Sequence, residues 1–407
     1  MESTPLRPLA RYVEPIPFEH DGMRFVQLHD PLRYSDGALS VSLPAFILMT
    51  MMDGQTTLET IRAEFNANYN AGITIAEIAS LVKDLDKQFL LSNGNFEAQK
   101  KKLADEFAAQ KVRPSSLAGK SYPADPAELS ALLNGFLKED GGPAPFAIVA
   151  PHIDLHAGGA VFGAAYARLK HSTAETFVIL AIGHALDGDF FACIDKDFQT
   201  PLGASPVDRA FLSGLEAGFG EPLFANAYAH KNEHSAEFQV LLLQKLFAGQ
   251  PARKVVPILF SFPETIEDLD HPAYNKQRVD RFIRALRTEI KRRPGKICLI
   301  AGVDLSHIGR RFNQEEGAAE QRLQETETDD RNLLRLVAEG NKPEFVRFMK
   351  ETNPRNNVCG FPALYVLLDL LDGRKGELLD YRQNVEPDTD SMVSFAAMSF
   401  PGAAGSE

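Results

Sequence analysis

Three apolar runs that each lead into a histidine constrain the fold of this chain most. The runs are short and almost wholly apolar, and they cover residues 146–151, 177–183 and 297–303. His152, His184 and His307 follow them closely. Continuous apolar runs of this length are typical of strands that helices cover on both faces. Ligands of open α/β sheets bind beyond the carboxyl ends of such strands, so the three histidines predict one shared site at one sheet edge.

Length and composition exclude several classes of protein. With 407 residues, of which 44% are hydrophobic, the chain is long enough for two domains. It has no apolar stretch near 18 residues, and its first residues lack an apolar signal region, so we expect no membrane partner. Its three cysteines form no CxxC pair, which favours the reducing cytoplasm. A net charge of −12 argues against binding of nucleic acid.

Residues 1–95 are expected to form a small domain of their own. We predict strands at 25–28 and 38–41, helices at 44–52, 57–69 and 74–89, and a closing strand at 89–91. Thr57 and Thr74 are the expected helix N-caps, and Glu77 completes a capping box with Thr74. This order is the outline of a winged helix. The charged residues 96–112 are predicted to form a linking helix.

Residues 113–407 alternate strand-like and helix-like stretches, which predicts an α/β domain. We expect a mostly parallel central sheet flanked by helices, with a mixed sheet as the alternative. The predicted strands cover residues 146–151, 177–183, 191–194, 254–260 and 297–303, with a late pair at 378–382 and 393–400. Helix-like runs cover residues 240–246 and 363–371.

The segment from His152 to His156 contains two histidines and Asp154 between them, followed by Gly158 and Gly159. Isolated histidines more often cap a helix or lie on the surface than bind metal. The position after a strand raises the expectation of ligation here, and the same logic applies to His184. Asp304 lies three residues before His307, so it could orient an imidazole through a hydrogen bond.

Two further clusters could carry chemistry. Glu233, His234 and Glu237 precede a helix-like run, and the two glutamates are spaced to face one side of a helix. They are either functional groups or an acidic cluster favoured by the helix dipole. The segment is not HExxH, so a zincin is not supported. Cys359 lies at a helix entrance, where a thiolate is favoured, although a small buried hydrophobe is the more common role.

With these segments in chain order, residues 113–398 resemble the Memo family, also called AmmeMemoRadiSam system protein B. The segments that carry the resemblance are Ala150-Pro-His152 with Gly158-Gly159, Gly183-His184, Glu233-His234-Ser-Ala-Glu237, Asp304-Leu-Ser-His307 and Val358-Cys359-Gly360. The resemblance implies a fold like that of class III extradiol dioxygenases (LigB-like). Dioxygenase activity does not follow from a shared fold.

The resemblance also implies a metal site. Carried over residue by residue, the ligands become His152, His184, His307 and Cys359, with Asp304 beside them. The usual PHAGY motif is altered here, so either His152 or His156 could take the family position. We favour His152, and keep Asp154, His156 and Glu237 as further candidate ligands. Three histidines and a thiol suit iron or copper, with zinc as an alternative. The candidate catalytic residues are Cys359, Asp304, Glu233 and His234.

Residues 1–95 resemble the PqqD-type winged helix, which binds peptides for radical-SAM enzymes. The matching segments are Asp36-Gly-Ala-Leu-Ser, Leu43-Pro, Met52-Asp-Gly54, Thr57-Leu-Glu-Thr-Ile and Phe89-Leu-Leu. This range holds 7 Lys and Arg against 12 Asp and Glu, unlike a DNA-reading winged helix. We therefore expect a metal protein with redox or oxygen-related chemistry that acts with a radical-SAM partner. The alternatives are a non-catalytic peptide-binding or protein-binding module and a metal-dependent hydrolase with Glu233 or Glu237 as base.

Overall fold

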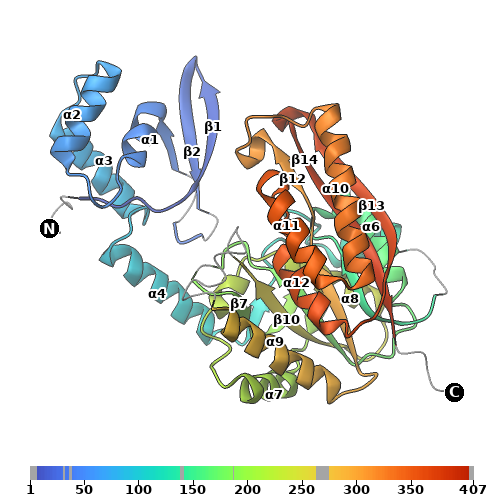
Figure 1. Cartoon of the computed structure of the whole chain (residues 1–407). Coiled ribbons are helices and arrows are strands. Elements are labelled where there is room, and N and C mark those ends of the chain that lie inside the picture. Colours follow the sequence, from blue (N-terminus) through green and yellow to red (C-terminus); the bar gives the residue numbers. More distant parts are fainter. Residues whose placement is uncertain are drawn as a thin grey trace. The chain divides into compact units, whose positions relative to one another are not determined.

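The structure is a computed structural model that describes residues 7–30, 33–35, 39–137, 142–186, 188–262 and 275–402. The chain divides into two compact units, Met1–Ala109 and Gln110–Glu407. Figure 1 shows the elements of both units. Among the described helices, none combines the length and the apolar character that a membrane span needs.

The first unit is an antiparallel sheet followed by four helices. Its strands are β1 (Glu14–His20), β2 (Met23–His29) and β3 (Leu39–Ser42), in the order β1-β2-β3. The helices are α1 (Leu43–Thr50), α2 (Leu58–Tyr69), α3 (Ile75–Lys87) and α4 (Gly94–Ala109). Both predicted N-caps are confirmed: Thr57 accepts from the backbone of Thr60, and Thr74 forms a capping box with Glu77.

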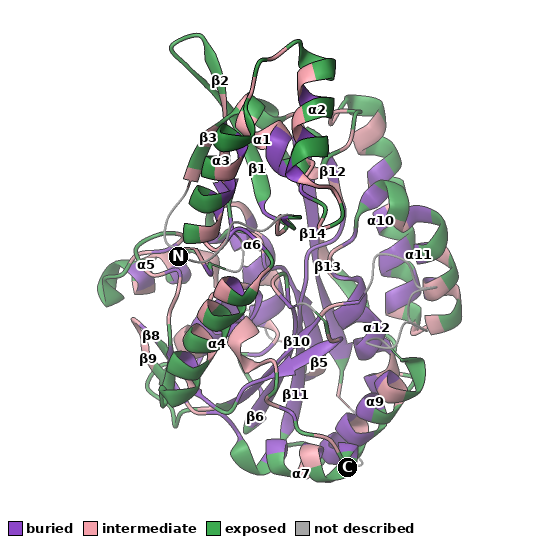
Figure 2. Cartoon of the chain, turned by 90° about the vertical axis from the view of Figure 1, so that its left-hand side faces the viewer, coloured by how far each residue is buried: buried purple, intermediate pink, exposed green. Residues whose placement is uncertain are grey.

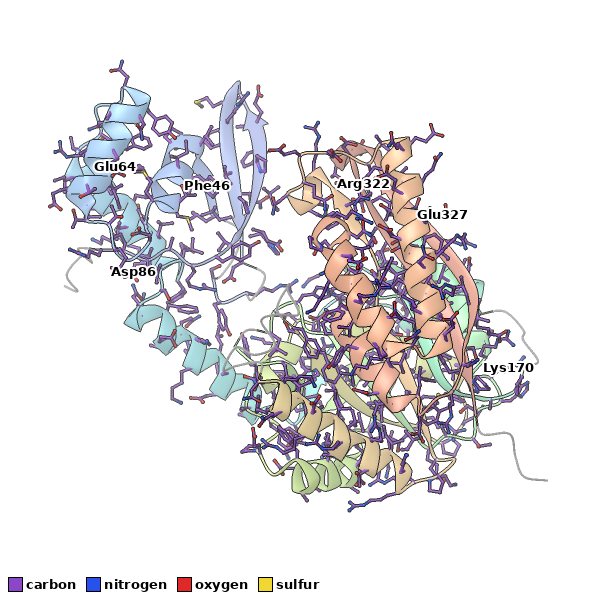
Figure 3. All side chains as sticks on the ribbon, in the orientation of Figure 1. Phe46, Glu64, Asp86, Lys170, Arg322 and Glu327 are labelled. Atoms are coloured by element: carbon purple, nitrogen blue, oxygen red, sulfur yellow. The ribbon has the colours of Figure 1, made fainter. Side chains whose placement is uncertain are left out.

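One face of each of the helices α1, α2 and α3 supplies the core of this unit. Ile61 of α2 and Val82 of α3 are fully buried, together with Leu28 of β2. Phe46 on α1 packs against this core, whereas Glu64 lies on the exposed side of α2 (Figure 3). Burial of apolar side chains at a helical spacing explains why the sequence pattern located α2 and α3 correctly.

The end of the first unit differs from the prediction. The expected strand at 89–91 is reduced to an isolated bridge between Leu91 and Ala10. Phe89 adopts a left-handed conformation with φ of 57°, and the backbone of Leu90 bonds back to Leu85, so the chain turns sharply after α3. Strand β1 was not predicted. Residues 36–38, which carry part of the PqqD resemblance and of the predicted second strand, lie outside the described residues.

The second unit is built around an eight-stranded mixed sheet. Its order is β12-β14-β5-β11-β6-β10-β7, with β13 paired to β14. The strands are β5 (Pro145–Ala150), β6 (Thr176–Ile182), β7 (Phe191–Cys193), β10 (Lys254–Phe260), β11 (Ile297–Gly302), β12 (His307–Gly309), β13 (Glu377–Glu386) and β14 (Ser391–Pro401). All seven predicted strands of this unit are confirmed.

The sheet is less parallel than predicted. Strands β5, β11, β6 and β10 are mutually parallel, but β14 runs antiparallel to β5 and β7 runs antiparallel to β10. The β13–β14 hairpin and β12 extend the sheet beyond β5 with antiparallel pairs. A separate small sheet contains β4 (Val112–Pro114), β8 (Asp197–Thr200) and β9 (Gly203–Ser205), which were not predicted.

Helices cover both faces of the central sheet. The first layer contains α5 (Pro126–Phe136), α6 (Leu155–Ala167) and α8 (Ser235–Leu246), with α6 against β5 and β14 and α8 against β6. The second contains α9 (Lys276–Lys291), α10 (Glu320–Glu339), α11 (Lys342–Asn356) and α12 (Phe361–Leu370), with α12 against β6 and β11. Helix α7 (Arg209–Phe219) packs on α9. Figure 2 shows buried strands and exposed outer helix faces.

The helix α10 is tied to the end of α11 by polar contacts. Arg322, labelled in Figure 3, donates to the main-chain oxygen of Arg355 and to the side-chain oxygen of Asn356. The segment that follows α11 contains Cys359 and leads into α12. These contacts therefore help to fix the entrance of α12 beside the carboxyl edge of the sheet.

Candidate metal centre

The predicted site residues follow the carboxyl ends of three neighbouring parallel strands. His152 comes two residues after β5, His184 comes two residues after β6, and Asp304 comes two residues after β11. These strands are adjacent in the order β5-β11-β6. The histidines therefore converge because the strands run in the same direction and end at the same edge.

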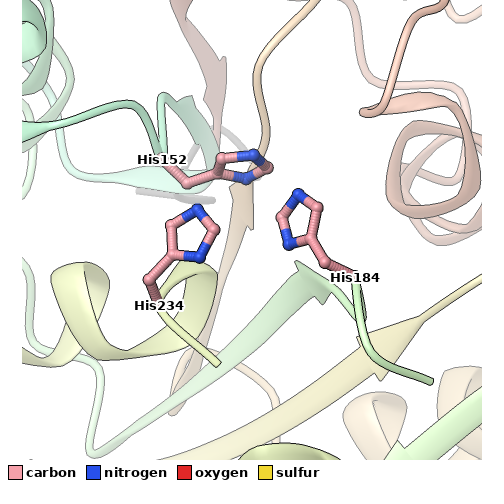
Figure 4. A group of neighbouring side chains, drawn as sticks. All are labelled: His152, His184 and His234. Atoms are coloured by element: carbon pink, nitrogen blue, oxygen red, sulfur yellow. The ribbon is translucent and has the colours of Figure 1, made fainter. Parts of the chain in front are cut away.

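Three imidazoles form a group that could hold a metal ion. His152, His184 and His234 each offer one ligand atom, and these atoms lie within 4.8 Å of one another. The ring centroids are separated by 5.0 Å for His152 and His184, 5.2 Å for His152 and His234, and 4.8 Å for His184 and His234. Figure 4 shows the three rings facing a common centre. His152 is buried, His234 is partly buried and His184 is exposed, so the group opens to solvent on the side of His184.

His234 reaches this group because α8 begins at the end of β6. The hydroxyl of Ser235 donates to the carbonyl of Ile182, the last residue of β6, over 2.7 Å. His234 is the residue directly before α8, and Glu233 precedes it. Helix α8 thus starts five residues earlier than the predicted run at 240–246. Glu233 lies outside the helix, so Glu233 and Glu237 do not share a helix face as predicted.

Glu233 orients two of the three imidazoles. Its Oε1 accepts from Nδ1 of His184 at 3.1 Å and from Nδ1 of His234 at 3.2 Å. Its oxygens also accept from the backbone amides of His184 and Ser235. A carboxylate can only accept, so both Nδ1 atoms carry the proton and both Nε2 atoms of the neutral rings keep a lone pair. This arrangement of a carboxylate behind a histidine is common around protein metal sites.

Main-chain carbonyls orient His152, the third imidazole of the group, and the nearby His307 in the same way. Nδ1 of His152 donates to the carbonyl of Gly302 over 3.0 Å, and Nδ1 of His307 donates to the carbonyl of Leu305 over 3.0 Å. Each of the four rings therefore presents an unprotonated Nε2 in its neutral form. Neutral imidazole is the form that binds metal.

Burial and local charge keep the site in this state. Burial lowers the pKa of His152 well below its ordinary value, and His184 and His234 lower it further whenever they are protonated. Burial also lowers the pKa of His307 to about 4. Burial alone would raise the pKa of Glu233, but the interactions with His184 and His234 hold it well below its usual range. Near neutral pH, His152 and His307 are therefore uncharged and Glu233 is ionised.

Asp304 fixes the backbone of the first histidine. Its Oδ1 accepts from the backbone amides of His152 at 2.9 Å and Ile153 at 3.1 Å. Its Oδ2 lies 3.7 Å from Nε2 of His152. Burial raises the pKa of Asp304, although His307 and the two amides oppose that shift. Asp304 therefore fixes the backbone of His152. The sequence predicted a hydrogen bond from Asp304 to the imidazole of its neighbour His307, but Nδ1 of His307 donates to the carbonyl of Leu305 instead.

Cys359 lies beside His152 rather than inside the histidine group. Its Sγ is 3.5 Å from Nε2 of His152 and 3.7 Å from the carbonyl of Asp304. This approach requires Gly360, because a Cβ there would lie 2.4 Å from the carbonyl oxygen of Asp304. Burial and the charge of Asp304 raise the pKa of Cys359 well above its ordinary value. The thiolate tendency expected at a helix entrance is therefore reversed by burial, as long as no cation is bound.

The remaining candidates have other contacts. Asp154 caps α6 by accepting from the backbone of His156, and the side chain of His156 is exposed on that helix. Glu237 is fully buried and accepts hydrogen bonds from Arg113, Tyr122, and the segment from Ser116 to Leu117. We therefore assign Asp154 and Glu237 structural roles. His307 and Cys359 are not members of the group formed by His152, His184 and His234.

A buried carboxyl supports the loop that carries Asp304 and His307. Asp330 on α10 accepts from the hydroxyls of Ser306 at 2.6 Å, Ser394 at 2.5 Å and Tyr381 at 2.9 Å. Burial raises the pKa of Asp330 to about 6. Sequence reasoning missed this residue, because an aspartate within a charged helix such as α10 looks like part of its solvated face.

The sequence also missed that Glu233 is shared by two histidines. The signal was the dipeptide Glu233-His234 directly before Ser235, a residue type that often begins a helix. Its partner His184 is 49 positions earlier in the chain. Contacts of that separation are set by the order of the strands, which the local pattern does not reveal.

The fold and the site together define an α/β protein with a candidate histidine metal centre at the carboxyl edge of a mixed sheet. Comparison with known proteins places it in a family. The family described as Memo-like protein matches residues 113–399, and the chain belongs to this Memo family. The match covers most of the second unit, including every residue of the candidate centre.

Individual relatives agree with this assignment. A MEMO1 family protein of Aquifex aeolicus is 29% identical over 399 residues, covering 97% of this chain and 100% of the relative. One of Thermus thermophilus is 30% identical over 345 residues, covering 84% of this chain and 98% of the relative. One of Methanopyrus kandleri is 26% identical over 306 residues, covering 71% of this chain. The similarity to the Aquifex protein therefore extends into the first unit.

Proposed function

We propose that this Memo family member binds iron or copper at His152, His184 and His234 and carries out redox or oxygen-related chemistry. The observation that carries the proposal is the shared carboxylate of Glu233, which directs two Nε2 atoms toward the position that a third imidazole also faces. Three neutral imidazoles suit copper, iron or zinc, and a nearby thiol favours the softer metals. A bound iron or copper ion would supply one-electron or oxygen chemistry.

The surrounding residues have distinct roles in this proposal. Glu233 and the carbonyl of Gly302 fix the tautomers of the ligands. Asp304 fixes the backbone of His152 and, with its raised pKa, can hold a proton at Oδ2. Cys359 lies within 3.5 Å of Nε2 of His152, where it can serve as a further ligand or a redox-active thiol. His307 is a candidate additional ligand, because its Nε2 is also unprotonated.

For the first unit we propose a PqqD-like winged helix that presents a peptide to a radical-SAM partner in the cytoplasm. Its sheet has two edge strands, β1 and β3, each with one partner in the described residues. An extended peptide can pair with such an edge. The charge of residues 1–95, with 7 basic and 12 acidic side chains, favours a peptide over nucleic acid. For the second unit we propose an extradiol dioxygenase-like (LigB-like) fold.

The hydrolytic alternative has less support. Both oxygens of Glu233 already accept hydrogen bonds from His184, His234 and Ser235, so they are poorly placed to accept a proton from water. Glu237 is occupied by its ion pair with Arg113. Neither carboxylate is available as a general base without breaking these contacts.

Metal analysis tests the proposal. The full chain, purified anaerobically without a histidine tag, is expected to contain near-stoichiometric iron or copper. The double variant His184→Ala with His234→Ala should lose the metal, because two of three ligands are removed. His156→Ala is the matched control, since His156 is exposed and outside the group. Metal retained by the double variant would contradict the assignment, and wild-type protein that binds no metal would favour the non-catalytic binding module.

A further inference from the structure

The second unit contains a cavity at the amino ends of the central strands, whereas the histidine group lies at their carboxyl ends. It has a volume of about 450 Å³ and lies against Pro145 at the start of β5 and Ile297 at the start of β11. The histidines follow the carboxyl ends of the same strands. A strand of six residues spans roughly 20 Å, so the cavity is separate from the candidate metal centre.

The cavity wall combines cations with an apolar surface. Four basic side chains line it, Arg287, Lys291, Arg293 and Arg374, against one acidic side chain, Asp372. Phe146, Ile290, Ile297 and Leu370 supply apolar surface in the same wall. The chain as a whole has a net charge of −12, so this local excess of cations runs against its average. A concave site with excess positive charge concentrates anions.

Two of these cations, Arg293 and Arg287, are anchored by groups outside the cavity. Arg293 pairs with Asp208 at 3.1 Å and with Glu289 at 3.0 Å. Arg287 donates to the main-chain oxygen of Asp369. Each guanidinium has five donors, so these anchors fix its position and leave other N–H groups for a ligand. Anchoring of this kind lowers the entropy cost of binding.

Arg374 is the cation best placed to hold a ligand. Its guanidinium lies over the ring of Phe146, 4.1 Å from the centroid, and Nη1 donates to the carbonyl of Leu371 over 3.0 Å. Its Nε is buried and has no hydrogen-bond partner in the part of the chain that the structure describes. Within that part, no carboxylate forms an ion pair with it, whereas Lys291 pairs with Asp372 at 2.9 Å.

We propose that this cavity binds a small organic anion, a phosphate or carboxylate group carried on an apolar body. Arg374 binds the anionic group, Lys291 contributes the N–H groups that its pair with Asp372 leaves over, and Phe146, Ile290 and Leu370 contact the apolar body. A volume of about 450 Å³ lies within the usual range for small-molecule sites. The proposal is independent of the metal assignment, because none of these residues belongs to the histidine group.

Calorimetric titration of the chelator-treated full chain tests the proposal. The probes are phenyl phosphate and benzoate, which separate phosphate from carboxylate, with inorganic phosphate and neutral benzyl alcohol for comparison. Chelation prevents the anions from binding to a metal. We expect one saturable site for phenyl phosphate or benzoate, weaker binding of inorganic phosphate and benzyl alcohol, and loss of affinity at high salt.

The variants locate the site. Arg374→Met and Lys291→Met should each lower the affinity for the more tightly bound organic anion by about tenfold or more, because each removes a charged donor. Arg347→Met removes an equivalent charge from the exposed side of α11 and should leave affinity unchanged. Thermal unfolding checks each fold, and Lys291→Met provides the second test if Arg374→Met does not fold.

Three results would overturn the proposal. One is absence of saturable binding up to about 10 mM of either organic anion. Another is wild-type affinity in both Arg374→Met and Lys291→Met. The third is binding of benzyl alcohol as tight as that of the anions, which would show an apolar pocket without anion recognition.

Discussion

At the scale of single residues, the candidate centre depends on which nitrogen of each imidazole carries the proton. Glu233 and the carbonyls of Gly302 and Leu305 accept from Nδ1 in every case. Glu233→Gln tests this directly, since an amide can donate to Nδ1 and favour the wrong tautomer. We expect metal affinity to fall by about 10- to 100-fold. Competition with a chromophoric chelator measures it.

A matched substitution controls for general effects of removing a glutamate. Glu175→Gln changes an exposed carboxylate that pairs with Lys296 on the same unit. It should leave metal affinity unchanged. If Glu233→Gln also bound metal like the wild type, Glu233 would have no part in orienting the ligands.

Gly360 permits the close approach of the Cys359 turn to Asp304. Gly360→Ala would place a Cβ 2.4 Å from the carbonyl oxygen of Asp304, so the turn must shift. We expect a loss of about 1–3 kcal/mol in the free energy of unfolding. Gly135→Ala is the control, because its Cβ would meet nothing within 4 Å and alanine favours the helix. Urea unfolding compares the two, and equal midpoints would contradict the steric argument.

At the scale of elements, the sequence located the strands of the second unit because each is a run of buried apolar residues. The run from Phe177 to Ile182 is buried throughout, and its pattern needs no partner to be recognised. The short strands β8 and β9 were missed because they contain few apolar residues. The antiparallel edges were missed because strand direction depends on connections between distant segments rather than on local pattern.

The candidate site was predicted in part for the same reason. The histidines after β5 and β6 could be found from strand ends, whereas the contact of Glu233 with His184 depends on where α8 docks against β6. The reversal of the thiolate tendency at Cys359 depends on burial, which the residues on either side of it do not specify.

Asp330 joins α10 to β13, β14 and the loop of Asp304, and its protonation should affect stability. Its pKa in the folded chain is raised to about 6 from 3.8. Its contribution to the free energy of unfolding is therefore fully present below about pH 4 and is lost as the pH rises to about 6. The stability lost between low and high pH amounts to up to about 3 kcal/mol.

Asp330→Asn should remove this loss of stability, because an amide stays neutral at every pH. Its oxygen can accept from Ser306, while its NH2 group donates to the hydroxyl oxygens of Ser394 and Tyr381. Unfolding free energies of both proteins between pH 4 and pH 8 test the expectation. The variant should gain stability relative to the wild type as pH rises. A difference curve that is flat would show that Asp330 does not titrate in this range.

At the scale of the whole molecule, the two units have separate cores. Ile61→Ala creates a cavity in the first unit, where this side chain is fully buried. It should cost that unit about 2–5 kcal/mol and leave metal content unchanged, because all candidate ligands belong to the second unit. Calorimetric unfolding and metal analysis measure the two effects. Glu64→Ala, on the exposed side of the same helix, is the control. Loss of metal in Ile61→Ala would show that the units are not independent.

The carbonyls of Gly302 and Leu305, which accept from His152 and His307, belong to the last residue of β11 and to the loop that follows it. The main chain that ends the sheet therefore also aligns the imidazoles. Local unfolding at the end of β11 and in the loop after it would release the imidazoles before the centre of the sheet unfolded. A spectroscopic signal from a bound metal would then fade during gentle heating while the circular dichroism of the helices persisted, so the metal would act as an early reporter of local unfolding.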